Sequence, residues 1–200
     1  MFKKIIVSLC FGFVFAVLLS TANFDASCNE LRDNVLRLHI IANSDSDNDQ
    51  QLKLQIRDAI LNYNGSCFNG CDNIEDAAAA ANNNLQSFYN TAKDVITKNG
   101  YDYDVDVSIA NSYFPTRQYE DCQLPAGYYK ALKIVIGEGK GKNWWCVMFP
   151  SVCIPANNNS GLSDKVGAKS VDIANNSQKY VIKFKAVEIY GNLKEKMFGK

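Results

Sequence analysis

The chain has 200 residues, no formal net charge, and charged side chains at 21% of its positions. This length is enough for one domain with a hydrophobic core of its own, without a metal ion to hold it together. A nucleic-acid-binding protein would carry a clear excess of basic residues, so the balanced charge argues against a nucleic-acid partner.

The N-terminal residues have the pattern of a secretory signal peptide. Lys3 and Lys4 precede an apolar run over residues 5–19, and small residues follow it up to Ala22. We therefore predict a signal peptide over residues 1–22, cleaved after Ala22. An uncleaved anchor is the alternative, because the apolar run is just long enough to cross a bilayer. Both interpretations predict that residues 23–200 form a single exported domain.

The cysteines that follow the apolar run are even in number, and outside the cytoplasm an even number favours disulfides. Cys10 lies in the apolar run and would leave with it. The cysteines of the domain are then Cys28, Cys67, Cys71, Cys122, Cys146 and Cys153. The sequence does not fix the pairing. Two local pairs are plausible, Cys67 with Cys71 and Cys146 with Cys153.

Residues 35–43 are rich in β-branched side chains and predict a buried strand. The acidic stretch that follows places carboxylates at alternating positions, as a calcium loop does. An EF-hand loop beginning at Asp45 would need Gly and Glu where Gln50 and Ile56 stand. We therefore interpret Ser44 or Ser46 as the cap of a helix rather than as a metal ligand.

Two helices are predicted next. Apolar residues recur every three or four positions over residues 47–63, and Asp49 and Lys53 lie one turn apart there, which predicts a weak ion pair. A second helix, capped by Asp72 or Asn73, is predicted from Ile74 through the alanine-rich stretch to the Asn-Gly pair at 99–100.

The remainder of the chain is predicted to alternate strands and turns before a last helix. Residues 101–109 alternate polar and apolar side chains, which indicates a strand with one wet face. Residues 128–136 and 144–149 are predicted to form a hairpin around a Gly/Lys turn. An Asn/Ser/Gly-rich mobile loop at about 155–177 and a closing helix over 180–198 complete an α+β fold, with helices packed on a small, mostly antiparallel sheet.

No catalytic, cofactor or metal site is predicted. The glycines at 137, 139 and 141 do not fit a dinucleotide-binding loop, because the third comes one residue too early and a strand follows instead of a helix. A Cys-His hydrolase would need a thiol in an electropositive pocket, whereas Cys146 lies in a predicted strand and His39 in an apolar run. The sequence favours His39 as a structural residue.

Two blocks of the sequence resemble the stage II sporulation protein R family. The first reads LHIIANSDS over residues 38–46 and continues with Asp49-Gln50, Leu52-Lys53 and Arg57-Asp58. The second reads LPAGY over residues 124–128 and continues to NWWCVMFP at 143–150. A match to the family pattern continues into Phe184-Lys185 and Val187-Glu188, while Ser151-Val152 departs from it.

The resemblance implies a signalling protein that does not itself catalyse a reaction. Proteins of this family are exported from the forespore into the space between the two septal membranes. There they trigger a membrane-embedded aspartic protease of the mother cell, which processes the precursor of sigma factor E. The partner would then be this protease, with the domain close to a membrane and without a small-molecule substrate. The alternatives are a secreted Cys-dependent hydrolase and a cell-wall or glycan-binding module.

Exposed residues of the two blocks are the candidates for partner binding. Tryptophan is a frequent anchor at interfaces, and adjacent residues of a strand point to opposite faces, so we expect one of the two tryptophans to be exposed or to lie in a groove. The candidate residues are Asn43, Ser44, Asp45, Ser46, Asn143, Trp144 and Trp145.

Overall fold

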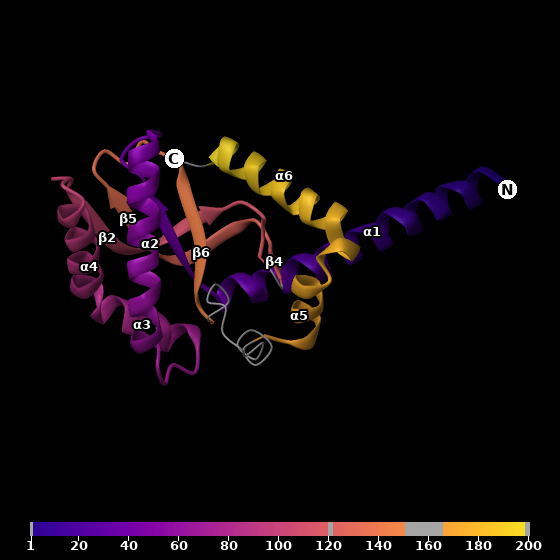
Figure 1. The fold of residues 1–200 in the computed structure, drawn as a ribbon. Helices are drawn as coiled ribbons and strands as arrows, with labels where there is room; N and C mark the ends of the chain where they lie inside the picture. Colours follow the sequence, from indigo (N-terminus) through magenta and orange to yellow (C-terminus); the bar gives the residue numbers. More distant parts are fainter. Residues whose placement is uncertain (1, 120–121, 151–165, 199–200) are drawn as a thin grey trace.

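A four-stranded sheet forms the centre of the protein (Figure 1). The computed structural model describes residues 2–119, 122–150 and 166–198. The strands lie in the order β2-β5-β1-β6, and β1 is parallel to β5 while the other neighbours are antiparallel. The predicted α+β fold with a mostly antiparallel sheet is confirmed. The strand bounds are Val105–Phe114 for β2, Gly127–Ile136 for β5, Leu36–Ile41 for β1 and Asn143–Phe149 for β6.

The predicted hairpin is wrong in its pairing, although both of its strands exist. β1 lies between β5 and β6, so these two strands do not contact each other directly. Residues 36–40 are buried on both faces of the sheet. A strand of this kind buries the most apolar surface in a central position of the sheet. The turn over residues 137–142 therefore crosses the end of β1 instead of joining two neighbours.

Three helices cover one face of the sheet (Figure 1): α2 (Asp47–Cys67), α3 (Ile74–Asn83) and α4 (Leu85–Lys98). The second predicted helix is divided at Asn84. The side chain of Asn84 donates to the carbonyl of Ala80 and accepts from the hydroxyl of Tyr63, and these bonds help to end α3. The main core between sheet and helices includes Leu38, Ile40, Ile56, Ile60, Phe88, Ile96, Leu132 and Ile134.

The opposite face of the sheet is covered by both ends of the chain. α1 (Phe2–Asp33), α5 (Ala168–Asn175), the short helix η1 (Ser177–Tyr180) and α6 (Val181–Phe198) lie here, beside the small strands β3 (Arg117–Gln118) and β4 (Gln123–Leu124). The start of α6 agrees with the predicted closing helix. The predicted mobile loop is only partly tested, because residues 155–165 lie outside the described residues, but α5 contradicts it over 168–175.

α1 continues without a break through the predicted cleavage site after Ala22. Its first part projects from the body of the protein (Figure 1), and its last part belongs to the core through the buried side chains of Phe24, Cys28 and Leu31. No helix within the described part of the chain is long and apolar enough to cross a membrane. Many side chains of residues 1–22 lie outside the described part, so the cleaved signal peptide and the uncleaved anchor both stay predictions.

A fully buried arginine joins the sheet to this second face. Arg37 donates from Nε to the carbonyl of Cys146 at 2.8 Å and from a terminal nitrogen to the hydroxyl of Tyr119. Its guanidinium lies 4.2 Å from the ring centre of Phe114 and 4.8 Å from that of Tyr129. Aromatic faces attract a cation, so these rings stabilise the charge within the core.

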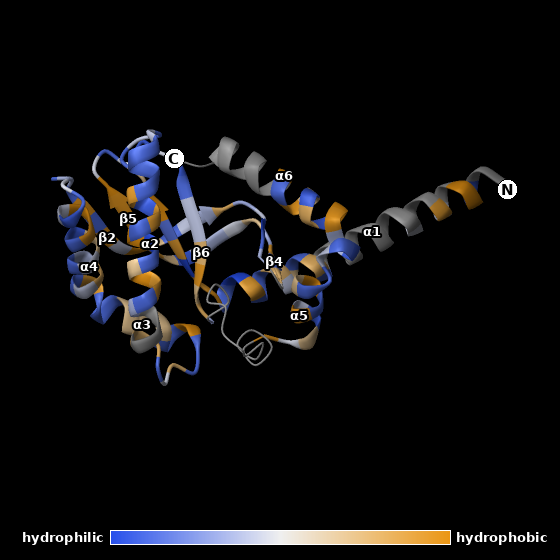
Figure 2. Ribbon diagram, in the orientation of Figure 1, coloured by the Kyte–Doolittle hydropathy of each residue, from blue (hydrophilic) through white to orange (hydrophobic). Residues whose placement is uncertain are grey.

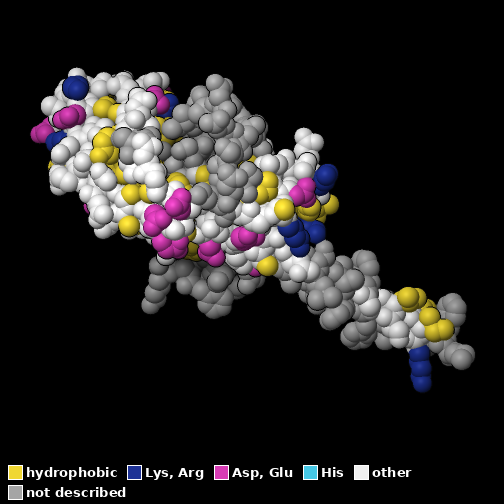
Figure 3. Space-filling view, turned by 90° about the horizontal axis from the view of Figure 1, so that it is seen from below, with side chains coloured by type: hydrophobic (Ala, Val, Ile, Leu, Met, Phe, Trp, Pro, Cys, Tyr) yellow, Lys and Arg dark blue, Asp and Glu magenta, His cyan; other side chains and the backbone are white. Residues whose placement is uncertain are grey.

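The surface follows from this arrangement. Apolar residues lie along the central strands and the inner sides of the helices, with hydrophilic residues outside (Figure 2). Both signs of charge occur on the face seen from below (Figure 3), as the balanced composition predicts.

The cysteines differ from the prediction at one pair. Cys67 and Cys71 carry thiols and are not joined by a disulfide, although they lie close enough for Cys71 to help raise the pKa of Cys67, after the larger effect of burial. The amide of Cys71 donates to the carbonyl of Phe68 and closes the turn between the two cysteines. Cys146 is disulfide-bonded. Cys153 lies outside the described residues, so its pairing with Cys146 stays a prediction.

Candidate functional site

The two sequence blocks meet at one edge of the sheet. β1 and β5 are parallel neighbours, so the loops that follow them emerge at the same edge. β6 begins there too, with Asn143 opposite Ile41. All seven predicted partner-binding residues lie at this edge or one turn from it, although they come from positions about a hundred residues apart in the sequence.

The glycine-rich turn over residues 137–142 is held against the loop that follows β1. The amides of Lys140 and Gly141 donate to the carbonyls of Asn43 and Ala42, and the amide of Glu138 donates to the side-chain oxygen of Asn43 at 3.0 Å. We call this contact between residues 42–46 and 137–142 the clamp.

The glycines permit the close approach within the clamp. A β-carbon on Gly141 would lie 2.2 Å from the carbonyl oxygen of Ser44, and one on Gly137 would lie 2.3 Å from the side-chain oxygen of Asn43. Gly137 also has a φ of 54°, which side chains disfavour. The sequence shows these glycines as turn residues, and the structure shows that they are needed because the turn passes over β1.

Asp49 is the acceptor that fixes the first half of the clamp. Its Oδ2 accepts from Ser44 Oγ at 2.6 Å and from Asn43 Nδ2 at 2.8 Å. Burial acts to raise the pKa of Asp49, but hydrogen bonds from Ser44, Asn43, Tyr103 and Ser46 outweigh it and hold the pKa below its ordinary value. Asp49 is therefore a buried carboxylate with a structural role.

The helix cap is confirmed. Ser46 Oγ accepts from the amide of Asp49, at the first turn of α2, and Ser44 Oγ accepts from the amide of Ser46. Asp45 is used by the clamp as well, because its carboxylate accepts from the amide of Lys142 at 2.7 Å. Within the described part of the chain, no three His, Cys, Asp or Glu side chains are grouped so that they could hold a metal ion.

Lys53 fixes the other half of the clamp, and the predicted ion pair with Asp49 is wrong. Its ammonium donates to Gln50 Oε1 at 2.6 Å and to the carbonyl of Lys142 at 2.9 Å. Burial lowers the pKa of Lys53, while the nearby Asp45 acts against this effect. Sequence reasoning missed this role, since the Lys142 carbonyl comes to Lys53 only through the crossing of the turn.

The two tryptophans lie on opposite faces of β6, and both are half-buried. Arg57 lies 4.4 Å above the Trp144 ring on the helix-covered face, and Arg117 lies 4.3 Å from the Trp145 ring on the other. Neither indole is fully exposed, because elements cover both faces of the sheet, and the expectation that one lies in a groove stays a prediction. Rings covered in this way offer a poor flat platform for a sugar, which argues against the glycan-binding alternative.

His39 is a structural residue, as the sequence favours. Its Nε2 lies 2.8 Å from Asn143 Oδ1 and its ring stacks near Trp145, with 6.2 Å between ring centres. Burial lowers the pKa of His39, so the neutral ring donates from Nε2 to Asn143. The hydrolase alternative loses its nucleophile, because Cys146 is disulfide-bonded, and Nε2 of His39 is engaged with Asn143. Burial also raises the pKa of the Cys28 thiol to about 12, so this thiol is unreactive.

The lowered pKa of His39 predicts how the stability of the protein depends on pH. Because the folded-state pKa is lowered, the unfolded chain binds the proton first when the pH falls below about 6.5. The free energy of unfolding should therefore be constant above that pH and decrease below it. Urea unfolding between pH 7.5 and 5 measures this slope. A His39→Gln variant should show a flatter profile, and an unchanged slope in the variant would contradict the assignment.

Exposed polar residues border the buried part of the clamp. They come from both blocks, and we call them the clamp rim: Asp45, Ser46, Glu138, Lys140, Lys142 and Asn143. Glu138 and Lys140 form an ion pair at 2.8 Å on the surface. The site thus combines a fixed backbone with a mixed-charge outer edge, which suits recognition of another macromolecule.

Comparison with known proteins finds the same family that the two sequence blocks resemble. The family model described as Stage II sporulation protein R matches residues 32–159, more than half of the chain. The chain belongs to the stage II sporulation protein R family. It is also 40% identical, over 121 residues, to the stage II sporulation protein R of Bacillus subtilis strain 168. No solved structure matches the chain.

Family membership gives the protein a role in sporulation. The aligned residues make up 60% of this chain and 54% of the Bacillus subtilis protein, so the chain spans about half the length of that relative. The stage II sporulation protein R match includes the whole clamp, from residue 42 to residue 142. It leaves out most of α1 and all of α5 and α6, which pack together on the second face, so the resemblance expected at Phe184-Lys185 and Val187-Glu188 lies outside the matched residues.

Proposed function

We propose that the protein is an exported signal of sporulation that activates a membrane-embedded aspartic protease of the mother cell. The protease then processes the precursor of sigma factor E. The signal would act from the space between the two septal membranes, after export from the forespore. It would act by binding and would not itself catalyse the cleavage.

The observation that carries this proposal is the meeting of the two family blocks in the clamp. A structural role alone would account for the half-buried Asn43 and the buried Asp49 and Lys53, but not for the exposed polar residues that the same two loops present. Rigid loops with exposed charges make good recognition sites, because little conformational entropy is lost on binding. We therefore assign the clamp rim as the surface that the protease contacts.

Inverting the charges of one exposed pair tests this assignment. Glu138→Lys combined with Lys140→Glu keeps the ion pair and the net charge but reverses the charges that a partner meets. Like charges that face each other across an interface cost enough binding free energy to lower the affinity at least about tenfold. We expect a comparable loss of precursor processing when the variant is co-expressed with the protease and the sigma precursor.

The matched control inverts two charges elsewhere. Asp94 and Lys98 are exposed and lie one turn apart on α4, and neither belongs to the clamp. Asp94→Lys with Lys98→Glu should leave processing at the wild-type level. Equal processing by both double variants, at equal amounts of exported protein, would contradict the assignment of the rim.

A further inference from the structure

The outward face of α6 is apolar. Ile182 is 85% exposed and Ile189 is 52% exposed, and their spacing of seven residues places them on the same side of the helix. Val181, at 59%, borders them. We call these three residues the α6 stripe. A helix at the surface of a soluble domain ordinarily turns polar side chains to the solvent, so the stripe indicates a partner.

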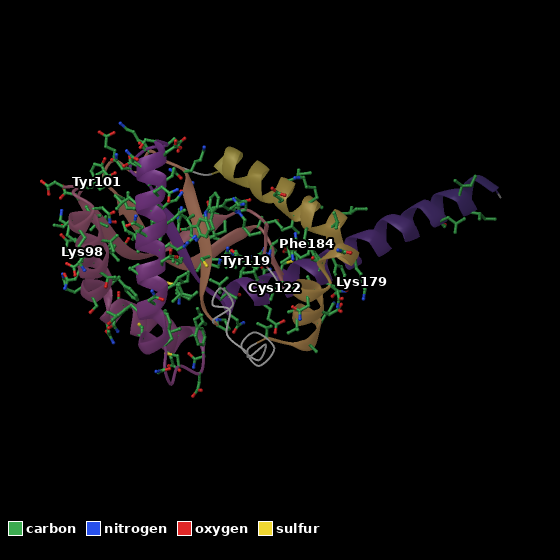
Figure 4. All side chains as sticks on the ribbon, in the orientation of Figure 1. Lys98, Tyr101, Tyr119, Cys122, Lys179 and Phe184 are labelled. Carbon is green, nitrogen blue, oxygen red and sulfur yellow. The ribbon has the colours of Figure 1, made fainter. Side chains whose placement is uncertain are left out.

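The stripe is not the face by which α6 packs on the domain. Phe184, on α6 (Figure 4), is buried, and its ring meets that of Phe24 edge to face at 5.3 Å. Tyr180 stacks on Phe24 from the preceding turn at 5.7 Å, and Ile173 of α5 completes this small core. α6 is thus apolar on two sides, one used by the domain and one exposed.

The charges around the stripe are basic. Lys179, Lys183 and Lys185 lie in or beside the first turns of α6. The ammonium of Lys183 lies over the rings of Phe24 at 5.6 Å and Tyr180 at 5.9 Å, and that of Lys185 is paired with the carboxylate of Glu188 at 3.2 Å. Lysine side chains can lie along an apolar surface while the ammonium reaches polar groups at its edge. Exposed isoleucines bordered by lysines fit a helix that lies in the surface of an anionic bilayer.

The position of α6 agrees with this partner. Phe24, on which α6 packs, comes two residues after the predicted end of the signal peptide or anchor. α6 therefore starts beside the point where the projecting part of α1 leaves the body (Figure 1). A bilayer that takes up the apolar run would also lie close to the first turns of α6.

We propose that the α6 stripe binds the surface of an anionic phospholipid bilayer and holds the domain against it. Isoleucine side chains would enter the boundary between headgroups and acyl chains, and Lys179 and Lys185 would contact lipid phosphates. α6 lies outside the residues matched to the family, so this proposal does not rest on the activation of a protease.

Tryptophan reporters in the full chain test whether the α6 stripe itself enters the bilayer. In an Ile182→Trp variant, vesicles of phosphatidylglycerol and brominated phosphatidylcholine should quench most of the added emission and shift it to the blue. High salt or an added Lys185→Glu change should weaken the quenching. Ile189→Trp is a second reporter. Tyr89→Trp is the control, because Tyr89 is exposed on α4, in the helix layer on the opposite face of the sheet.

The outcomes separate the possible partners. Quenching at 182 and 189 but not at 89, dependent on anionic lipid, supports the proposal. Equal quenching at all three positions, or none at 182, overturns it. The stripe binds protein if two results occur together: the Ile182→Trp reporter stays unquenched by vesicles, and the Ile182→Ser variant loses self-association or precursor processing. That combination also overturns the proposal. Unchanged quenching in the Glu138/Lys140 inversion variant would show that lipid binding and the clamp rim act separately.

Discussion

Replacing Gly141 by Ala should destabilise the clamp more than any other single methyl group added to the turn. The new β-carbon would lie 2.2 Å from the Ser44 carbonyl oxygen and 2.8 Å from the Ala42 β-carbon, so the backbone has to move. Overpacking of this kind costs about 3 kcal/mol of unfolding free energy. A domain commonly has about 5–15 kcal/mol, so the variant should stay folded with a displaced turn. Urea unfolding measures the cost, and we expect processing to be lost.

Lys140→Ala is the matched control for Gly141→Ala. Lys140 is the neighbouring residue of the same turn, its side chain is exposed, and its ion pair with Glu138 is a surface pair that contributes little. Stability should stay near that of the wild type. If Gly141→Ala unfolds at the same urea concentration as Lys140→Ala, the close passage of the turn over β1 is wrong.

Asp49→Asn should have the second large effect. The change keeps the shape of the side chain but removes its charge and leaves one acceptor oxygen for the donors Ser44, Asn43 and Tyr103. Loss of hydrogen bonds to a buried charged group costs about 3 kcal/mol. The loop at residues 43–46 would then lose its anchor, and processing should fall together with stability.

The pH dependence provides a second readout for Asp49. Hydrogen bonds hold its pKa below the unfolded value in spite of burial, so its contribution to stability is present above about pH 3.9 and is lost as the pH falls through the folded-state pKa. Asp49→Asn should remove this part of the acid-induced loss. Asp94→Asn, an exposed carboxylate on α4, is the control and should change neither property. Equal stability of the two variants would contradict the role of Asp49.

The sequence predicts the elements better than their pairing. The β-branched residues of 35–43 and the caps at Ser46 and Asn73 are local signals, and the structure confirms them. The strand predicted over residues 101–109 is wrong in its bounds, because β2 begins at Val105 and continues to Phe114. The hairpin failed because the choice of a strand's neighbour depends on residues far away in the chain. Nothing within residues 124–150 shows that β1, almost a hundred residues earlier, takes the place beside both strands.

The candidate site shows the same division. Family blocks pointed to the right two loops, and the structure brings them together at one edge of the sheet. Lys53 and the buried Arg37 were missed as contacts, because their acceptors, the carbonyls of Lys142 and Cys146, become neighbours only after the sheet is formed. The break at Asn84 was missed because an asparagine in a helical pattern ends the helix only when partners such as Tyr63 are in place.

Contact between the clamp rim and the protease can be measured directly by photo-crosslinking. A photoreactive amino acid at the Glu138 position, in cells that also contain the protease and the sigma precursor, should form a covalent adduct with the protease. The same amino acid at the Asp94 position should form none. A protease adduct from position 94 but not from position 138, in cells where the precursor is processed, would contradict the assignment of the clamp rim as the activating surface.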